Sequence, residues 1–166
     1  MRSKHRIVVA RAEHKFSCAH MTVFPDGRKE RLHGHNYTVS VALDLSRVGF
    51  EHLIDFGAIK RAIAAECADW RERTLVAGES PRLERLSRAG DELEMVLCGQ
   101  RYVFPEADVL VLPIDNTTTE ALAELWSDRL RARLAETLAG SAAVGLEVRI
   151  EETPGQGAIA YRALSL

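Results

Sequence analysis

The sequence predicts an α+β domain in which a four-stranded antiparallel sheet carries two helices on one face. Apolar and polar residues alternate with a period of two in four stretches, a pattern typical of half-buried strands. In two other stretches apolar residues recur at spacings of three and four, which is typical of amphipathic helices. Their order along the chain is strand, strand, helix, helix, strand, strand (ββααββ). This order favours an antiparallel sheet with the helices gathered on one side.

The first two strands are expected at residues 7–20 and 33–47, with a loop at residues 22–31 between them. The loop contains Pro25-Asp26-Gly27, a sequence typical of turns. Along each strand every second side chain points to the same face, and on one face these side chains are apolar or histidine. They are His14, Phe16, Cys18 and His20 in the first strand, and Tyr37, Val39, Val41, Leu43 and Leu45 in the second.

The two helices are expected at residues 56–70 and 118–138, each with one apolar stripe. The stripe of the first helix consists of Phe56, Ile59, Ile63, Cys67 and Trp70. That of the second consists of Leu122, Trp126, Leu130, Leu134 and Leu138. Thr117 and Glu120 have the spacing of a capping box, so we expect the second helix to begin there.

The rest of the chain is expected to add a short hairpin and two final strands. Residues 71–90 are polar and are predicted to be irregular. The hairpin is predicted at residues 92–97 and 101–104, and we interpret the segment near 91–104 as an insertion. The final strands are predicted at residues 144–152 and 157–164, on either side of the turn sequence Thr153-Pro154-Gly155-Gln156.

The composition is that of an ordinary globular protein. The chain has 166 residues, 46% hydrophobic and 28% charged, with a net charge of −2, which predicts a single domain over residues 1–166. The absence of a basic excess argues against a nucleic-acid partner, and no apolar run is long enough for a membrane span. The three cysteines are odd in number and lack C-x-x-C spacing, so we expect a cytoplasmic protein with reduced thiols.

Three histidines form a candidate metal site. His33 and His35 lie two residues apart on the second strand, so their side chains face the same way. His20 ends the first strand, and a hairpin of the two strands brings all three imidazoles together. Three protein ligands with one open position are typical of catalytic zinc. The alternative is that the pair is simply two exposed strand histidines. Cys18 shares the face of His20 and is expected to be a packed thiol.

Glu152 is a candidate for ligand binding. It continues the alternation of Leu146, Val148 and Ile150, so its carboxylate lies on the apolar face, where it needs hydrogen-bond donors. An aminopyrimidinone ring, which presents an NH₂ and a ring N–H side by side, supplies two. The alternative is a salt bridge to a neighbouring arginine such as Arg162.

Several motifs resemble those of the 6-pyruvoyltetrahydropterin synthase and 6-carboxytetrahydropterin synthase family. They are Phe16-Ser17-Cys18-Ala19-His20, Leu32-His33-Gly34-His35-Asn36-Tyr37, Ile54-Asp55-Phe56, Asn116-Thr117-Thr118-Thr119-Glu120 and Glu152-Thr153. The resemblance implies the tunnelling fold, whose subunits assemble into barrels, and a homo-oligomer for which we expect a hexamer built as a dimer of trimers. It also implies Zn²⁺ on the three histidines and a pterin held by Glu152.

Two further contacts to the pterin are implied by the resemblance alone. In the family, the segment that matches Thr118 and Glu120 borders the pterin pocket, so both are candidate substrate-binding residues. For Glu120 the alternative is a purely structural role in the capping box at the start of the second helix.

The chain departs from the family at the catalytic residues. Family enzymes carry a cysteine shortly before the H-G-H motif, activated by an Asp-His pair after the first helix. Here Lys29 stands at the position of that cysteine, and Arg71-Glu72 stand where the Asp-His pair falls. The resemblance therefore identifies a divergent member in which the metal and pterin ligands remain while the usual proton-transfer residues are replaced.

Two carboxylates are candidates for the missing catalytic group, Glu30 and Glu72. Some family members carry a glutamate where Glu30 stands and cleave the side chain of dihydroneopterin to give 6-hydroxymethyl-dihydropterin. We favour Glu30, because it lies three residues before His33 and must stay near the metal. The expected substrate is 7,8-dihydroneopterin triphosphate or a related dihydropterin. The alternative is a catalytically silent homologue that binds pterins or purines.

Overall fold

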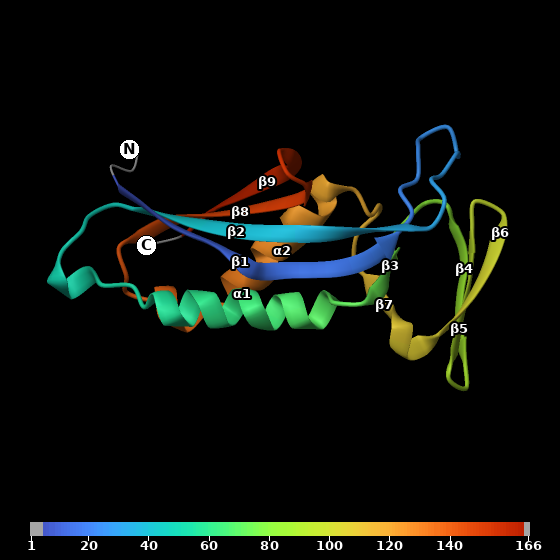
Figure 1. Cartoon of the computed structure of the whole chain (residues 1–166), viewed down its shortest axis with the longest axis horizontal. Coiled ribbons are helices and arrows are strands. Elements are labelled where there is room, and N and C mark those ends of the chain that lie inside the picture. Colours follow the sequence, from blue (N-terminus) through green and yellow to red (C-terminus); the bar gives the residue numbers. More distant parts are fainter. Residues whose placement is uncertain (1–4, 165–166) are drawn as a thin grey trace.

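The computed structural model describes residues 5–164 and contains two sheets and two long helices (Figure 1). The larger sheet consists of β1 (His5–His20), β2 (His33–Leu45), β3 (Arg73–Ala77), β7 (Val109–Leu112), β8 (Ala143–Thr153) and β9 (Gln156–Ala163). The smaller sheet consists of β4 (Leu83–Ala89), β5 (Glu92–Leu97) and β6 (Gln100–Pro105). The helices are α1 (Phe56–Trp70), α2 (Thr119–Arg133) and the short α3 (Ala135–Leu138), with 3₁₀ turns η1 (Phe50–His52) and η2 (Glu106–Asp108).

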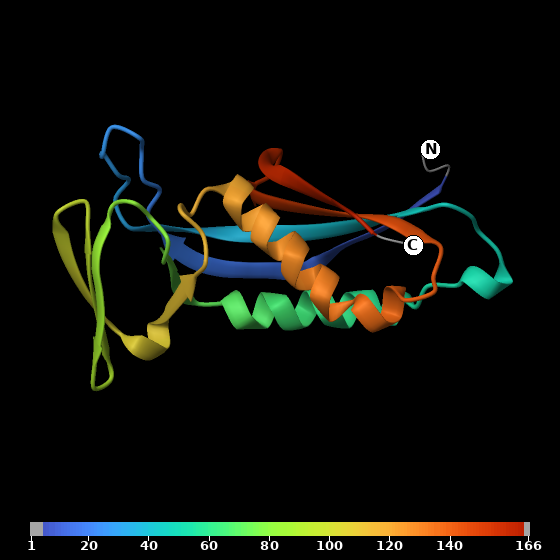
Figure 2. The same cartoon turned by 180° about the vertical axis from the view of Figure 1, so that it is seen from behind.

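The larger sheet has six strands in the order β7-β3-β1-β2-β8-β9, so the prediction of a four-stranded sheet is wrong. The four predicted strands are present and pair antiparallel, as expected. Two short strands extend this sheet in parallel: β3 pairs with β1, and β7 pairs with β3. The helices α1 and α2 lie on one face of the sheet, as predicted (Figures 1 and 2).

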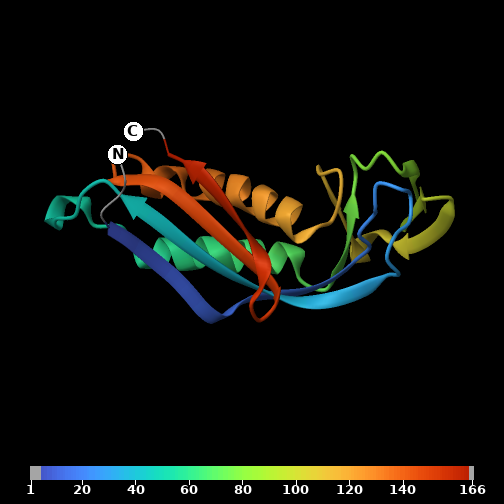
Figure 3. The same cartoon turned by 90° about the horizontal axis from the view of Figure 1, so that it is seen from above.

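Residues 71–90 are not irregular, because they contain β3 and β4. The predicted hairpin is confirmed as β5 and β6, but β4 pairs with β5, so the accessory structure is a three-stranded sheet. One face of β5 is buried through Leu93, Met95 and Leu97. These side chains form a second hydrophobic core that also contains Met21, Val76 and Val109. The accessory sheet stands at one end of the molecule (Figure 3).

The main core lies between the six-stranded sheet and the helices. The predicted stripe of α1 is buried through Ile59, Ile63, Cys67 and Trp70, whereas its first member, Phe56, is exposed. Phe16 on β1 lies at the centre of an aromatic cluster, with ring centroids 5.2 Å from Tyr37, 5.5 Å from Trp70 and 5.3 Å from Trp126. Such pairs contribute about 0.5–1.5 kcal/mol each beyond their burial. The cluster joins both helices to the strands that carry the histidines.

The helix boundaries differ from prediction at α2. The predicted helix is interrupted at Leu134, where ψ is 2°, and α3 continues beyond it. Thr118 is the N-cap of α2, and its hydroxyl accepts a hydrogen bond from the Ala121 amide at 3.3 Å. The predicted capping box is therefore wrong by one residue. The Thr117 hydroxyl instead donates to the Met21 carbonyl at 3.1 Å. Within residues 5–164, no helix has the length and apolar character needed to cross a bilayer.

A buried ion network joins the two helices. Glu66 on α1 has no solvent exposure and accepts from Arg133 at 2.7 Å, Arg129 at 3.0 Å and the Trp70 indole at 2.8 Å. The hydrogen bond to Glu66 is the main reason that the pKa of Arg133 is raised. A carboxylate buried at a helix interface needs such donors, because burial without them is strongly unfavourable.

We therefore expect Glu66→Gln to lower the free energy of unfolding by about 2–3 kcal/mol. This is below the roughly 3–5 kcal/mol typical of breaking a fully buried pair, because both arginine side chains are about a third exposed. Urea denaturation measures the change. Asp69→Asn is the matched control, since Asp69 also pairs with Arg133 but is exposed, and should cost less than about 1 kcal/mol. Equal effects of the two changes would contradict a buried network.

Candidate metal centre

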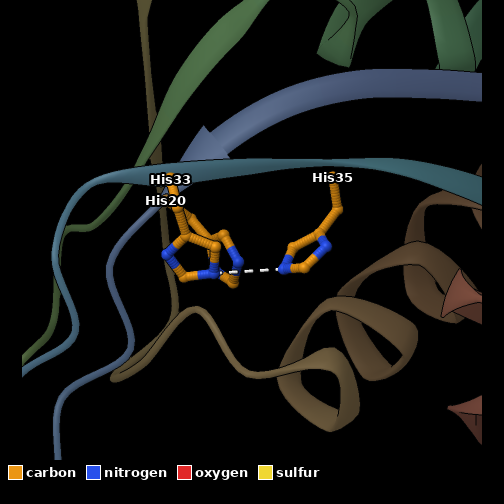
Figure 4. Close-up of side chains that lie close together, drawn as sticks. All are labelled: His20, His33 and His35. Carbon is orange, nitrogen blue, oxygen red and sulfur yellow. Dashed lines mark hydrogen bonds between the residues drawn. The ribbon is translucent and has the colours of Figure 1, made fainter.

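The pairing of β1 with β2 brings the three predicted histidines together. In this antiparallel pair, His20 lies opposite His33 and Cys18 lies opposite His35. Gly34 allows the two strands to approach at this point, because a Cβ there would lie 3.0 Å from the Cys18 carbonyl oxygen. The three imidazoles point toward the segment that leads into α2 (Figure 4).

The nitrogen atoms of the three imidazoles converge. One nitrogen from each ring can be chosen so that all three lie within 4.8 Å of one another, and Nε2 of His33 is 3.1 Å from Nε2 of His35. The ring centroids are separated by 4.7 to 5.4 Å. Because imidazole nitrogen is a preferred ligand of Zn²⁺ and other first-row divalent ions, this cluster could hold a metal.

Hydrogen bonds from the outer ring nitrogens orient two of these ligands. Nδ1 of His20 lies 2.9 Å from the Thr117 carbonyl, and Nδ1 of His33 lies 2.8 Å from the Arg31 carbonyl. A carbonyl can only accept, so each Nδ1 carries the proton and each Nε2 presents a lone pair to the cluster. Burial lowers the pKa of His20, which also favours the neutral form that a metal requires.

Two predicted glutamates flank the imidazoles. An oxygen of Glu30 lies 3.8 Å from Nε2 of His33, and an oxygen of Glu152 lies 3.9 Å from Nε2 of His35. These residues line one pocket of about 410 Å³. Its lining is His20, Thr22, Glu30, His33, His35, Thr118, Thr119, Glu120, Glu152, Gln156 and Gly157. The pocket therefore contains the predicted metal ligands, the predicted pterin contacts and one of the two predicted catalytic residues.

Glu152 is held in this pocket by two donors. One carboxylate oxygen accepts a hydrogen bond from the side-chain NH₂ of Gln156, and the other accepts one from the Thr119 hydroxyl at 3.2 Å. Its side chain is 17% exposed. Arg162 binds Glu124 and Asp128, so the alternative of an ion pair between Arg162 and Glu152 is wrong.

Thr119 and Gln156 are the site residues that the sequence analysis missed. Thr118 rather than Thr117 is the N-cap of α2, and with this start of the helix Thr119 faces Glu152. The sequence has three threonines in a row, so it could not show which of them would bind the carboxylate. Gln156 lies opposite Thr153 where β8 turns into β9. The turn sequence itself could have pointed to it, because hairpin closure places the two ends of a short turn side by side. Glu120 and Thr118 also line this pocket, and their contact with a pterin stays a prediction.

The other two residues singled out from the sequence lie outside this cluster. Glu72 lines another pocket, of about 480 Å³, whose lining includes Cys18 and, of the three histidines, His35 alone. Its φ of 59° is left-handed, and its amide donates to the Ser17 carbonyl at 2.7 Å. Cys18 is buried, and burial raises the pKa of its thiol to about 12, as expected for a packed side chain.

The family model described as 6-pyruvoyl tetrahydropterin synthase matches residues 9–163. The chain belongs to this family. A Methanocaldococcus jannaschii protein, provisionally named 6-carboxy-5,6,7,8-tetrahydropterin synthase, is 34% identical over 145 residues, which cover 87% of each chain. This result confirms the resemblance on which the expectations about the three histidines and Glu152 depend.

Solved structures of family members share the fold. The 6-pyruvoyl tetrahydropterin synthase of Plasmodium vivax superposes with a TM-score of 0.89 at 26% identity, covering 96% of this chain and 98% of that one. Two further structures of that P. vivax protein carry alanine or cysteine in place of a glutamate identified as a catalytic residue. The six-stranded sheet with two helices on one face is thus the fold of a 6-pyruvoyl tetrahydropterin synthase.

We expect the purified protein to bind about one zinc ion per chain, and His33→Ala or His35→Ala to lose most of it, because two imidazoles rarely suffice for a stable site. Metal analysis by mass spectrometry measures this. His5→Ala is the control, because His5 is an exposed residue at the far end of β1. Full zinc content in both site variants would exclude this cluster as the metal centre.

Proposed function

We propose that this protein is a zinc-dependent enzyme acting on 7,8-dihydroneopterin triphosphate or a related dihydropterin, from which it eliminates triphosphate, cleaves the side chain, or both. The observation that carries this proposal is the meeting of three imidazoles with Glu30 and Glu152 in one pocket. The names of the family's relatives, which are tetrahydropterin synthases, support the class of substrate.

The three imidazoles fit Zn²⁺. His20, His33 and His35 would hold the ion through the nitrogens that face the cluster, and the backbone carbonyls behind two of them keep these rings in the required tautomer. When bound, Zn²⁺ supplies Lewis-acid polarisation of a side-chain oxygen and lowers the pKa of that group.

Glu152 is the proposed anchor of the pterin ring. An ionised carboxylate only accepts hydrogen bonds, and an aminopyrimidinone ring presents two donors on one edge. The Thr119 hydroxyl and the Gln156 amide occupy one acceptor position on each oxygen, which leaves each oxygen a second one. The carboxylate is thus oriented before the ligand arrives, and Thr118 and Glu120 complete the proposed wall of the pterin site.

Glu30 is the proposed general acid–base. Its carboxylate lies 3.8 Å from Nε2 of His33, whereas that of Glu152 lies 3.9 Å from Nε2 of His35, so the two carboxylates approach different imidazoles. The catalytic glutamate of the P. vivax relative supports a carboxylate in this role. Glu72 is the second candidate, and we rank it below Glu30 because its pocket contains His35 alone, whereas the pocket of Glu30 contains all three imidazoles.

A catalytically silent pterin- or purine-binding protein is the second candidate function. One observation favours it: Lys29, which stands at the position of the family's cysteine, is turned away from the pocket and lies over the Tyr102 ring. In this alternative the metal and Glu152 bind the ligand, while Glu30 takes no part in chemistry.

We also propose that the protein is a homo-oligomer, a hexamer built as a dimer of trimers. The helices cover one face of the six-stranded sheet, while Val8, Ile159 and Tyr161 are exposed large hydrophobic residues on the strands β1 and β9. The strands β7 and β9 are the edges of this sheet and have backbone groups free for pairing with another chain.

Glu152→Gln should weaken the binding of dihydroneopterin by about 10²- to 10³-fold. An amide group replaces one acceptor with a donor, so a charge-assisted contact is lost and a mismatch worth roughly 3–4 kcal/mol appears. Calorimetry on the folded variant measures the affinity. Glu151→Gln is the matched control, because Glu151 binds Arg149 and the Gly155 amide instead. Unchanged affinity in Glu152→Gln would remove Glu152 from the site.

Incubation of the purified protein with 7,8-dihydroneopterin triphosphate, followed by mass spectrometry of the products, tests the proposed reaction. Glu30→Gln should lower turnover by about 10²- to 10⁴-fold, the usual contribution of a general acid–base, while the zinc content is unchanged. Glu72→Gln should have a smaller effect. If Glu72→Gln lowers turnover more than Glu30→Gln does, Glu72 takes the role of general acid–base. If the unaltered protein binds the dihydropterin without turning it over, the silent homologue is favoured.

A further inference from the structure

The residues that carry Glu30 form a small hairpin between β1 and β2. Val23 pairs with Lys29 in an antiparallel bridge, and the Phe24 amide donates to the Arg28 carbonyl at 2.8 Å. The Glu30 amide donates to the Thr22 carbonyl at 2.9 Å. Glu30 therefore lies at the end of the returning strand, and its position depends on how the hairpin is held.

The outgoing strand of this hairpin is held by the segment that precedes α2. The Asn116 side chain accepts from the Val23 amide at 3.0 Å and donates to the Val23 carbonyl at 2.7 Å. The Thr117 hydroxyl donates to the Met21 carbonyl at 3.1 Å. These three bonds hold the backbone of residues 21–23, but none of them reaches the strand that carries Glu30.

The returning strand is held by the accessory sheet. The Lys29 ammonium lies over the Tyr102 ring of β6, 5.1 Å from its centroid. It also lies 3.8 Å from the Met21 sulfur and donates to the Glu30 carbonyl at 3.3 Å. Tyr102 is itself fixed, because it stacks on Phe104 and its hydroxyl donates to Gln100 at 2.8 Å. The hairpin stands beside the accessory sheet in Figures 1 and 3.

We propose that Lys29 and Tyr102 are positioning residues that hold Glu30 beside the imidazoles, and that the accessory sheet supplies this support. The inference rests on the proposed function, because it assigns Glu30 its catalytic role. The Glu30 side chain is 39% exposed and lies 3.8 Å from His33. A carboxylate with that much freedom contributes to catalysis only when its backbone is held in place, since misplacement by about 1 Å can cost on the order of 100-fold in rate.

The cation–π contact explains why a lysine stands beside Glu30. Lys29 and Glu30 are neighbours in the chain, yet the Lys29 ammonium lies over the Tyr102 ring while the Glu30 carboxylate lies 3.8 Å from His33. An ammonium group over an aromatic face is attracted by the ring quadrupole, and the attraction is stronger where water is partly excluded. Lys29 is partly buried, which suits this role.

The test compares Tyr102→Leu, which removes the ring, with Tyr102→Phe, which keeps it. We expect Tyr102→Leu to lower kcat by about tenfold, equivalent to roughly 1.4 kcal/mol, with KM and zinc content unchanged. Tyr102→Phe should retain the activity. Leu86→Ala is the matched control for lost packing in the accessory sheet, because Leu86 packs on the same core but belongs to β4.

A double variant distinguishes positioning from a general loss of stability. A residue that acts through Glu30 has no effect once Glu30 is replaced, so Tyr102→Leu should leave the residual rate of Glu30→Gln unchanged. If the losses of kcat in the two single variants multiply in the double variant, the inference is overturned. It is also overturned if Leu86→Ala lowers kcat as much as Tyr102→Leu does.

Amide hydrogen exchange on the whole protein gives a readout that needs no turnover. Tyr102→Leu should speed exchange in residues 22–31 by about fivefold or more, while Tyr102→Phe should not. If the unaltered protein turns over no dihydropterin, the proposed function fails, yet the exchange result still decides whether the accessory sheet holds the hairpin. Unchanged exchange in Tyr102→Leu would overturn the inference.

Discussion

The pairing of β1 with β2 is the constraint on which the rest of the site depends. A strand presents alternate residues to alternate faces, so a shift of one residue in the pairing would send His33 and His35 to the opposite side from His20. The aromatic cluster around Phe16 prevents such a shift. Phe16 and Tyr37 lie opposite each other on these two strands and stack, Phe16 also stacks on Trp126 of α2, and both belong to the main core. The histidine cluster is therefore aligned by the hydrophobic core beside it.

The segment from Asn116 to Thr119 connects the parts of the site that this core does not reach. Its four residues contact, in order, the hairpin of Glu30, the His20 ring, the first turn of α2 and the carboxylate of Glu152. Neighbouring residues in an extended segment point in different directions, so a short stretch of polar residues can serve several elements at once. The residues at the cap of α2 therefore also orient the His20 ring and the Glu152 carboxylate.

The sequence predicted those features that depend on periodicity. The histidine face of β1 and β2, the stripe of α1 and the position of Glu152 follow from alternation or helical spacing, and the structure confirms them. The strands β3 and β7 were missed because they are four or five residues long and carry no alternation. Thr119 and Gln156 were missed because their role depends on where a helix begins and on how two strands meet, which only the folded chain determines.

The presence of two hydrophobic cores has a consequence for how the protein responds to heat. The smaller core, around Leu93 and Met95, meets the larger sheet through short strands, whereas the larger core includes the long strands and both helices. Such units can open with separate free energies, and we expect the smaller one, which has fewer buried apolar residues, to open at the lower free energy. Because the hairpin of Glu30 contacts the smaller unit through Lys29 and Tyr102, the order of this hairpin and the global fold are separable properties of this chain. Warming would then release the hairpin through a local opening, at temperatures where the histidine cluster is still assembled.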